Sequence, residues 1–316
     1  MSLKSLILGG SMLAAATLIG GIADPGAARA DTLTAATILQ DFNAIIYNNA
    51  STGSDIEGAA VVGGSFTGAT VYNNPTGSQP AGFGALTVFG STSGNSINLD
   101  NGGSAYVPST SRGAHINFNG GGSYLTTAPG ATIADFEAPL DNLSTELSQL
   151  TATGTVPSPT NNEVIKAVPG SDGIAVIDLT AAELDEIPSY HIDLNGASTL
   201  IINVSGSTVD FNANDESGTT GADNIIWNFY DATSVTLGTQ IAGTVLAPSA
   251  TVNNNNQIDG TLVAKSWTGG GELHDYPFDG TLPATSVPEP GTLGLLAGGL
   301  LAFFLLRSVR RRNASG

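Results

Sequence analysis

The chain of 316 residues contains no cysteine, only 6% aromatic residues and only 11% charged residues. Without cysteine, no disulfide can stabilise the fold, although this absence remains compatible with export from the cell. Few large rings are available to fill a core. A folded body must therefore be held together by small β-branched side chains and by hydrogen bonds between strands.

Basic residues are scarce where a folded body is expected. Of the nine Lys and Arg, only Arg112, Lys166 and Lys265 lie between residues 31 and 279, a range that contains 25 acidic residues. Contact with nucleic-acid phosphates requires clustered basic side chains. The composition therefore argues against nucleic acid as a partner and favours a soluble, exported protein.

Familiar catalytic motifs are also missing, including GxSxG, HExxH and the phosphate-binding loop. Among three histidines, His274 has Glu272, Asp275 and Tyr276 as neighbours, a set that can bind a metal or supply a base. No second histidine stands at ligand spacing, so we expect a structural role for His274. No catalytic residue is predicted.

A polysaccharide-acting enzyme on a β-helix scaffold is the alternative interpretation. Paired carboxylates such as Asp55 and Glu57 can cleave glycosidic bonds when they share one face. Glu57, however, falls at the position that Asp259 occupies in an internal repeat, and repeat geometry explains a recurring acid without catalysis.

That internal repeat is the most informative feature of the chain. Two blocks of seventeen residues share a core in which Ile241–Ala247 matches Ile258–Ala264, and Ile56–Gly63 has the same pattern upstream. A preceding block places Phe229 in register with Leu246. Stacked coils of this period bury a continuous core, so the repeat predicts an all-β solenoid. A β-sandwich with similar strands is the alternative.

Two segments have helical periodicity. Thr34–Tyr47 predicts a short helix, which we expect to cover the open end of the first coil. Ala131–Leu150 has the clearer pattern, and Pro139 inside it predicts a kink or a break. The apolar stripe that we expect to pack on the side of the β-body consists of Ile133, Phe136, Leu140, Leu143, Leu147 and Leu150.

Short apolar runs predict strands at residues 60–62, 85–89, 114–118, 174–179 and 200–204. Residues 180–186 predict one helical turn.

Residues 210–224 predict an acidic, Asn-rich loop in which Asp210, Asn212 and Asn214 alternate as calcium ligands do. Asp215 stands where a calcium loop needs glycine, and no glutamate closes the loop. We therefore expect no cofactor and keep calcium at these three residues as the alternative.

Two terminal signals flank the body. Residues 1–30 have a basic start, an apolar centre and small residues before the cleavage site, which predicts a signal peptide removed by signal peptidase. The cleavage site is formed by Ala28, Ala30 and Asp31. The body then spans residues 31–281, and residues 282–287 form a linker.

The C-terminal element begins with Val287, Pro288, Glu289 and Pro290. An apolar run over residues 291–306 predicts a membrane helix, and the basic cluster after it would stay cytoplasmic. That cluster contains Arg307, Arg310, Arg311 and Arg312. Together the three parts, residues 288–312, resemble the PEP-CTERM sorting signal. The resemblance implies a Gram-negative host that makes exopolysaccharide, transient anchoring in the inner membrane and cleavage by an exosortase.

Most of the body resembles the choice-of-anchor A domain. The motifs behind this resemblance are DFN at 41–43, DIEG at 55–58, VVGG at 61–64, IWNF at 226–229, GTVLAP at 243–248, GTLVA at 260–264, GELH at 271–274 and PF at 277–278. The resemblance implies a surface protein with an exchangeable anchoring signal. Collagen binding, known for some related domains, is not carried over, because no residues here identify a collagen groove.

These features predict a non-enzymatic surface protein for adhesion or for association with exopolysaccharide, extracellular matrix or biofilm. Sugar sites usually expose aromatic rings, so the ligand-binding candidates are Trp267, Tyr276 and His274, whereas Trp227 is expected in the core. Ice binding is a third hypothesis, but only Thr244 and Thr261 repeat in register. Two threonines are too few for a regular array.

Overall fold

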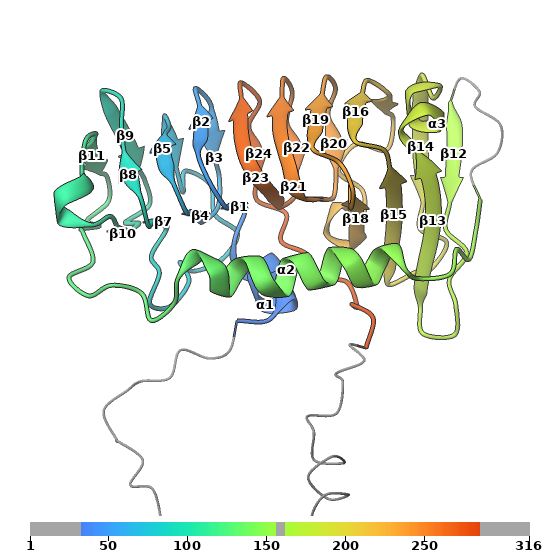
Figure 1. The fold of residues 1–316 in the computed structure, drawn as a ribbon, viewed down its shortest axis with the longest axis horizontal. Helices are drawn as coiled ribbons and strands as arrows, with labels where there is room; N and C mark the ends of the chain where they lie inside the picture. Colours follow the sequence, from blue (N-terminus) through green and yellow to red (C-terminus); the bar gives the residue numbers. More distant parts are fainter. Residues whose placement is uncertain (1–32, 156–161, 285–316) are drawn as a thin grey trace, which may run out of the picture.

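The computed structural model describes residues 33–155 and 162–284. Within them the chain forms a solenoid of parallel strands, and one long helix lies along the stack of coils (Figure 1). The prediction of an all-β solenoid is therefore confirmed. Its parallel ladders satisfy the backbone of each coil through the coils on either side.

The strands form three sides of the solenoid and one further small sheet. The first sheet contains, in spatial order, β10 (Ala105–Tyr106), β7 (Leu86–Val88), β4 (Ala60–Val62), β1 (Ala44–Ile46), β23 (Leu262–Gly269), β21 (Thr244–Asn254), β18 (Ile225–Asn228), β15 (Thr199–Ser205) and β13 (Ile174–Thr180). The second contains β11 (His115–Phe118), β9 (Ser96–Leu99), β6 (Thr70–Val71), β3 (Asp55–Ile56), β24 (Leu273–His274), β22 (Ile258–Asp259) and β20 (Ile241–Ala242).

The third side consists of β8 (Ser91–Thr92), β5 (Ser65–Thr67), β2 (Ala50–Thr52), β19 (Ser234–Leu237) and β16 (Thr208–Phe211), with the second halves of β21 and β23 between β2 and β19. The small sheet contains β12 (Glu163–Lys166), β14 (Ser189–Asp193) and β17 (Asn214–Asp215). The helices are α1 (Ala35–Asp41), α2 (Ile133–Ser148) and α3 (Ala181–Asp185), with 3-10 turns η1 (Ser109–Ser111) and η2 (Ala222–Asn224).

The order of the coils along the stack differs from their order in the chain. β1 lies in the middle of the first sheet, and β4, β7 and β10 extend from it to one end. α2 then carries the chain along the stack, and β13, β15, β18, β21 and β23 return from the other end (Figure 1). The last coil therefore stacks on the first, where Ala44 pairs with Leu262 and Ile56 with Leu273. We call this junction the seam.

The sequence repeat is a stacking register. Ile241 pairs with Ile258, which pairs with Leu273, which in turn pairs with Ile56. The upstream occurrence of the repeat thus lies in the same column as the downstream ones, although 185 residues separate Ile56 from Ile241 and 202 separate it from Ile258.

The register expected for Phe229 is wrong, because Asn228 is the residue that faces Leu246. One more residue separates Asn228 from Ser234 than separates Leu246 from Thr251, and these ends are themselves in register. The extra residue is absorbed at the corner between β18 and β19. A fixed period therefore fails wherever corners differ in length.

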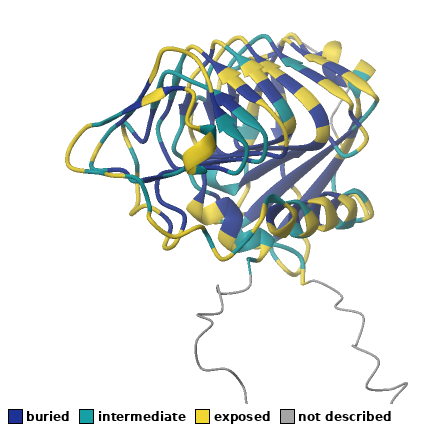
Figure 2. Ribbon diagram, turned by 60° about the vertical axis from the view of Figure 1, so that its left-hand side comes forward, coloured by how far each residue is buried: buried dark blue, intermediate teal, exposed yellow. Residues whose placement is uncertain are grey.

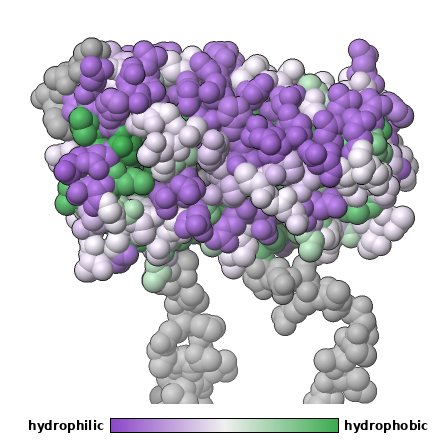
Figure 3. Space-filling model, turned by 180° about the vertical axis from the view of Figure 1, so that it is seen from behind, coloured by the Kyte–Doolittle hydropathy of each residue, from purple (hydrophilic) through white to green (hydrophobic). Residues whose placement is uncertain are grey.

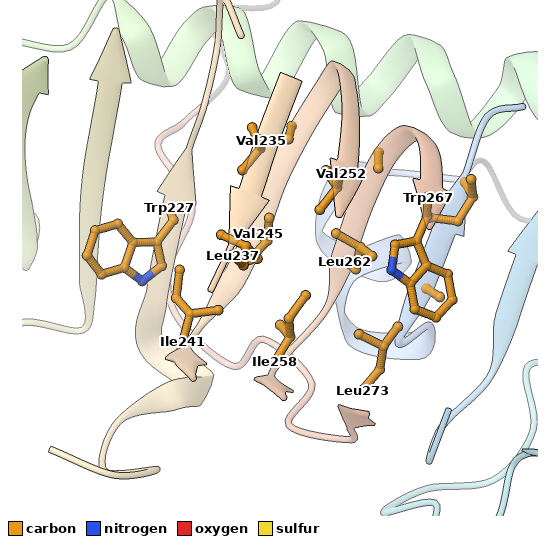
Figure 4. Packing of buried hydrophobic residues seen from close by; sticks show 14 of the residues in the cluster. Trp227, Val235, Leu237, Ile241, Val245, Val252, Ile258, Leu262, Trp267 and Leu273 are labelled. Atoms are coloured by element: carbon orange, nitrogen blue, oxygen red, sulfur yellow. The ribbon is translucent and has the colours of Figure 1, made fainter. Parts of the chain in front are cut away.

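Side chains that point into the solenoid form one apolar core (Figure 4). Trp227 and Trp267 are its largest members, and Trp227 packs edge-to-face against Phe211 and Tyr190 with ring centroids 5.3 and 5.8 Å apart. Aliphatic residues fill the space between the two indoles, and those labelled in Figure 4 are Val235, Leu237, Ile241, Val245, Val252, Ile258, Leu262 and Leu273.

α2 covers the outer side of the first sheet, as its apolar stripe predicts. Phe136, Leu140, Leu143 and Leu147 are buried against the sheet, while the opposite side of the helix is exposed (Figure 2). The expected break is wrong, because one helix runs through Pro139, whereas the kink stays a prediction. Burial on both sides of the proline holds the helix together despite the missing N–H group.

Buried polar contacts also fasten α2 to the sheet. The Asn228 amide donates to the Ser144 carbonyl at 2.9 Å and accepts from the Ser144 hydroxyl at 2.6 Å. The Asn203 amide donates to the Leu147 carbonyl at 2.9 Å. These hydrogen bonds fix the position of the helix along the stack as well as its distance from it.

α1 differs from its prediction in extent and in place. The helix ends at Asp41, and Ala44–Ile46 already form β1. The role of covering an open end is wrong as well, because β1 stands in the middle of the sheet. α1 instead lies beside α2, where Phe42 packs edge-to-face on Phe83 and Phe136 with ring centroids 5.6 and 5.3 Å apart.

Irregular segments pair with the outermost strands of the first sheet at both ends. The amide of Ala105 in β10 donates to Ser123, and its carbonyl accepts from Leu125. At the other end, the carbonyl of Val176 in β13 accepts from Thr153 and Gly154. These contacts satisfy strand edges that would otherwise invite aggregation.

Other local predictions hold with small changes. Strands occupy each of the five predicted segments, and α3 is the predicted helical turn, capped by Thr180. Residues 210–224 are wrong as a single loop, because they include the end of β16, all of β17 and the turn η2. β17 forms there because it pairs with β14 of the next coil.

Candidate adhesive surface

The third side of the solenoid alternates strictly between core and solvent. Val209, Val235, Val252, Trp267 and Phe66 point inward and are buried. Successive side chains of a strand point to opposite sides, so the residues before and after each of these point outward. The same pattern of outward residue types therefore recurs from coil to coil on the outer surface of this side.

Those outward residues form two ranks across the stack. The first rank contains Thr208, Ser234, Thr251, Ser266, Ser65 and Ser91, with Asn49 between Ser266 and Ser65. The second rank contains Asp210, Thr236, Asn253, Thr268, Ser51 and Thr67. We call this surface, with both ranks, the hydroxyl face. All but one of its members are Ser, Thr or Asn.

The spacing of the hydroxyl face follows from strand geometry. Neighbouring strands lie about 4.8 Å apart, and residues two apart along a strand lie about 7 Å apart. At one end of the stack, the hydroxyls of Ser65 and Ser91 lie 2.9 Å apart, and Ser93 extends the second rank with its hydroxyl 2.5 Å from that of Thr67. Exposed hydroxyls elsewhere in the ranks are available to a ligand that repeats on a similar scale.

The second sheet presents a different, charged surface around His274. Its Nδ1 lies 2.5 Å from Asp259 Oδ1, and its Nε2 lies 3.1 Å from Glu272 Oε2. Asp259 is fully buried, and its second oxygen accepts from the Gln240 amide at 2.5 Å. The carboxylates on both sides of the ring favour its protonated form.

An open groove of about 660 Å³ lies near this cluster, at the corner beside α1. Its lining includes Gln40, Glu57, Asn74, Asp275 and Tyr276. Glu57 accepts from the Asn74 amide and the Asp275 backbone, so these carboxylates already hold the corner together. The groove is thus lined by groups that also stabilise the seam.

A family model matches residues 35–275, and its description is "Putative Ice-binding-like adhesive domain". This range covers most of the chain. The chain belongs to this adhesive-domain family. The match is to the adhesive family and not specifically to choice-of-anchor A proteins, so the narrower resemblance stays a prediction. A second model, the PEP-CTERM protein-sorting motif, matches residues 286–312 and confirms the predicted sorting signal.

Solved structures similar to this adhesive domain include three described as ice-binding. A protein from the Antarctic ascomycete Antarctomyces psychrotrophicus is 15% identical, covers 75% of this chain and 95% of its own, and has a TM-score of 0.35. A protein from an Antarctic Flavobacteriaceae bacterium is 11% identical over 77% of this chain and 81% of its own, with a TM-score of 0.33. A domain from Shewanella frigidimarina is 15% identical over 77% of this chain and 97% of its own, with a TM-score of 0.30. No curated protein matches the chain.

Sequence reasoning missed the hydroxyl face of the adhesive domain. The two threonines considered for an array, Thr244 and Thr261, are 1% and 0% exposed, and the Thr261 hydroxyl donates to the Phe42 carbonyl. The signal that reveals the face is a polar–apolar–polar triplet in each coil, such as Thr251–Asn253 and Ser266–Thr268. These triplets are 15 residues apart rather than 17, because the pairing of β21 with β23 shifts register between Ala247 and Thr251.

The predicted ligand-binding residues of the adhesive domain are separated by the fold. Trp267 is 1% exposed and its indole N–H donates to Asn254, so it offers no ring to a ligand, contrary to expectation. His274 and Tyr276 are half-buried on the second sheet and its corner. Neither contributes to the hydroxyl face.

The alternating residues considered for calcium do not converge. Asp210 points outward in the second rank, whereas Asn214 pairs with Ser189 in the small sheet. Across residues 33–155 and 162–284, no group of three His, Asp or Glu side chains could hold a metal ion. Calcium at Asp210, Asn212 and Asn214 therefore stays an untested alternative.

The predicted terminal sites lie outside the described residues. This applies to the cleavage residues Ala28, Ala30 and Asp31 and to the sorting residues from Val287 to Arg312, including the predicted membrane helix over 291–306. Among the described residues, none of the helices has the length and apolar character that a membrane crossing requires.

The remaining surface carries few apolar side chains. Seen from behind, it is mostly hydrophilic, with a small hydrophobic patch toward the end that carries β12 (Figure 3). Val164 and Val168, each 47% exposed, are the large apolar side chains exposed among the described residues. An extended polar contact therefore suits this adhesive domain better than an apolar one.

Proposed function

We propose that the protein is an exported cell-surface protein that attaches to extracellular polysaccharide through the hydroxyl face. The observation that carries this proposal is the two ranks of Ser, Thr and Asn that continue across the seam. Membership of the adhesive-domain family and the match to a sorting motif support the same conclusion.

The route to the surface follows from the terminal signals. Signal peptidase would remove residues 1–30, and an exosortase of a Gram-negative host would process the protein near Pro288–Pro290 after transient anchoring in the inner membrane. Adhesion to the exopolysaccharide matrix of a biofilm is the setting we propose. The resemblance to choice-of-anchor A proteins fits a domain whose anchoring signal is exchangeable.

The position of the chain ends supports display of the hydroxyl face. Leu33 and Leu282 both pack against the α2 side of the molecule, and the described chain enters and leaves on that side (Figure 1). The sorting signal follows shortly after residue 284. Anchoring therefore takes place from the α2 side and leaves the hydroxyl face free.

Polysaccharide suits the chemistry of the ranks. A single hydrogen bond contributes only about 1 kcal/mol net, so isolated hydroxyl contacts bind weakly. Many such contacts along one repeating chain raise the overall affinity without any strong single site. Low charge across the ranks, where Asp210 is the only ionisable member, avoids the cost of desolvating ionic groups.

Ice is the second candidate ligand, and the same ranks favour it. A flat surface with hydroxyls at regular intervals can order water, and the family description names ice binding. The sequence suggested too few threonines for this role, but the pairing of strands assembles a far larger array. The mixture of Ser and Asn with Thr makes the array less uniform than one type of side chain would.

One comparison separates the two ligands. Residues 31–286 are tested for retention on the host's own polysaccharide and, separately, for incorporation into growing ice and for thermal hysteresis. Polysaccharide adhesion predicts retention without thermal hysteresis, and ice binding predicts the reverse. Absence of both would contradict adhesion through the hydroxyl face.

We propose no catalytic activity, and a polysaccharide-acting enzyme remains the alternative. Both ring nitrogens of His274 already contact carboxylates, which suits a structural role. Release of new reducing ends from polysaccharide by the purified protein, abolished in His274→Gln or Glu272→Gln, would instead support the enzyme.

A further inference from the structure

The seam is the one place in the first sheet where segments from the two chain ends stack on each other. Its backbone bonds run from Leu262 to the Asn43 carbonyl and from Trp267 to the Asn49 carbonyl. On the second sheet, the Glu57 amide donates to the Leu273 carbonyl. The chain itself contributes little to closing this junction, because more than two hundred residues connect its two sides.

Side chains reinforce the seam on the second sheet. The Asn43 amide donates to the carbonyls of Gly260 and His274 at 2.8 and 2.9 Å, and its oxygen accepts from the Gly58 amide. Asp275, the residue after His274, accepts from the backbone and hydroxyl of Thr76. His274 therefore lies where several contacts between the two halves meet.

Asp259 makes this position sensitive to charge. Its carboxylate is fully buried, and Gln240 supplies a neutral donor to one oxygen. His274 contacts the other oxygen and is the only ion-pair partner of Asp259 among the described residues. A buried carboxylate that loses its counter-charge is strongly unfavourable.

We propose that His274 is a protonation-controlled latch on the seam. In its imidazolium form it neutralises Asp259 from β22 and contacts Glu272, the residue before β24. Glu57 from the first coil, whose amide donates to the carbonyl of Leu273 next to His274, adds a third negative charge nearby. Loss of the proton leaves three carboxylates around a neutral ring and weakens the stacking of the last coil on the first.

The direction of the pH dependence follows from these neighbours. Burial lowers the pKa of His274, but hydrogen bonds to Glu272 and Asp259 and the charges of Asp259 and Glu57 outweigh burial and raise the pKa above its usual value. Because folding raises the pKa of His274, its protonation contributes its full stabilisation of the folded protein at pH values below the pKa of the unfolded state, about 6.5. That stabilisation is lost as pH rises through the folded pKa. The latch is thus closed in acid and opens toward alkaline pH.

Opening has a consequence for the hydroxyl face. Ser51 and Thr268 face each other across the seam, so separation of β2 from β23 divides the second rank. This consequence rests on the proposed adhesive function, whereas the latch itself does not. Structural and adhesive measurements therefore test the two ideas separately.

The test is hydrogen exchange of the full chain in mild detergent as a function of pH, corrected for intrinsic exchange. We expect the seam amides of Glu57, Leu262 and Trp267 to lose protection above the folded pKa of His274, while amides of β15 keep theirs. Across this titration, the equilibrium constant for opening the seam increases about tenfold for each unit by which the pKa of His274 in the folded state exceeds its pKa in the unfolded state. The imidazole resonance of His274 should titrate over the same pH range.

Three variants sharpen this experiment. His274→Gln should open the seam at every pH and remove the pH dependence of opening. Asp259→Asn should also weaken this pH dependence, because it removes the buried charge. His191→Gln, an exposed histidine on β14, is the matched control and should behave as wild type. Two results would overturn the proposal. In one, the seam amides are as well protected from exchange as the amides of β15 at all pH values. In the other, the pH dependence of seam opening persists in His274→Gln. If that variant does not fold, an imidazole titration that does not coincide with seam opening in the wild type has the same force.

Discussion

At the scale of single residues, the repeat motif depends on a glycine that sits too close to the next coil for any side chain. Gly260 has a φ of +157°, and a methyl group there would overlap the carbonyl of Gly243, its counterpart one coil away. The same position recurs in both blocks because each coil turns against its neighbour there. The shared Gly-Thr pattern is therefore a packing requirement and not a ligand motif.

We predict that Gly260→Ala lowers the free energy of unfolding by about 3 kcal/mol, because the new methyl group forces two stacked coils apart. Urea unfolding of the purified protein measures the change. Gly270→Ala is the matched control, since a methyl group added there meets no other atom within 4 Å, and it should change stability by less than about 0.5 kcal/mol. Equal effects of both substitutions would show that stacking at Gly260 is not limiting.

At the scale of elements, local patterns were sufficient for α2, α3, β13 and β15 and insufficient for α1. The stripe from Phe136 to Leu147 shows the face that α2 buries. Nothing near α1 reveals that Ala44 pairs with Leu262 in the middle of the stack, because that contact joins distant parts of the chain. The hydroxyl face was hidden for a related reason: corners of unequal length displace its triplets from the seventeen-residue period.

We predict that Leu140→Ala destabilises the protein by about 3 kcal/mol, because it leaves a cavity between α2 and the first sheet. Asn142→Ala on the exposed side of the same helix should cost less than about 0.5 kcal/mol. Thermal or urea unfolding distinguishes them. A similarly small loss for Leu140→Ala would mean that α2 contributes little to the fold.

At the scale of the whole molecule, the last coil completes the solenoid. β23 lies between β1 and β21, so both of these strands have an unpaired edge until the final coil is in place. Such apolar edges are prone to pair with other chains. Folding therefore finishes only when residues close to the sorting signal are available.

We predict that a chain ending at residue 257, which lacks β22, β23 and β24, aggregates or unfolds without cooperativity. A chain ending at residue 284 keeps every described strand and should unfold cooperatively as the control. Size-exclusion chromatography and circular dichroism on heating follow both. A monomeric truncated chain with the same unfolding midpoint would contradict the role of the seam.

The central claim is that the hydroxyl face is the adhesive surface, and retention of face-specific variants tests it most directly. The double variant Thr251→Tyr and Thr268→Tyr places two bulky rings on adjacent coils of the ranks, and Thr70→Tyr makes the same change on the second sheet. With all proteins equally folded by circular dichroism, we expect the double variant to lose most retention on the ligand that binds the wild type, and Thr70→Tyr to keep it. Undiminished retention of the double variant, or equal loss in Thr70→Tyr, would contradict adhesion through the hydroxyl face.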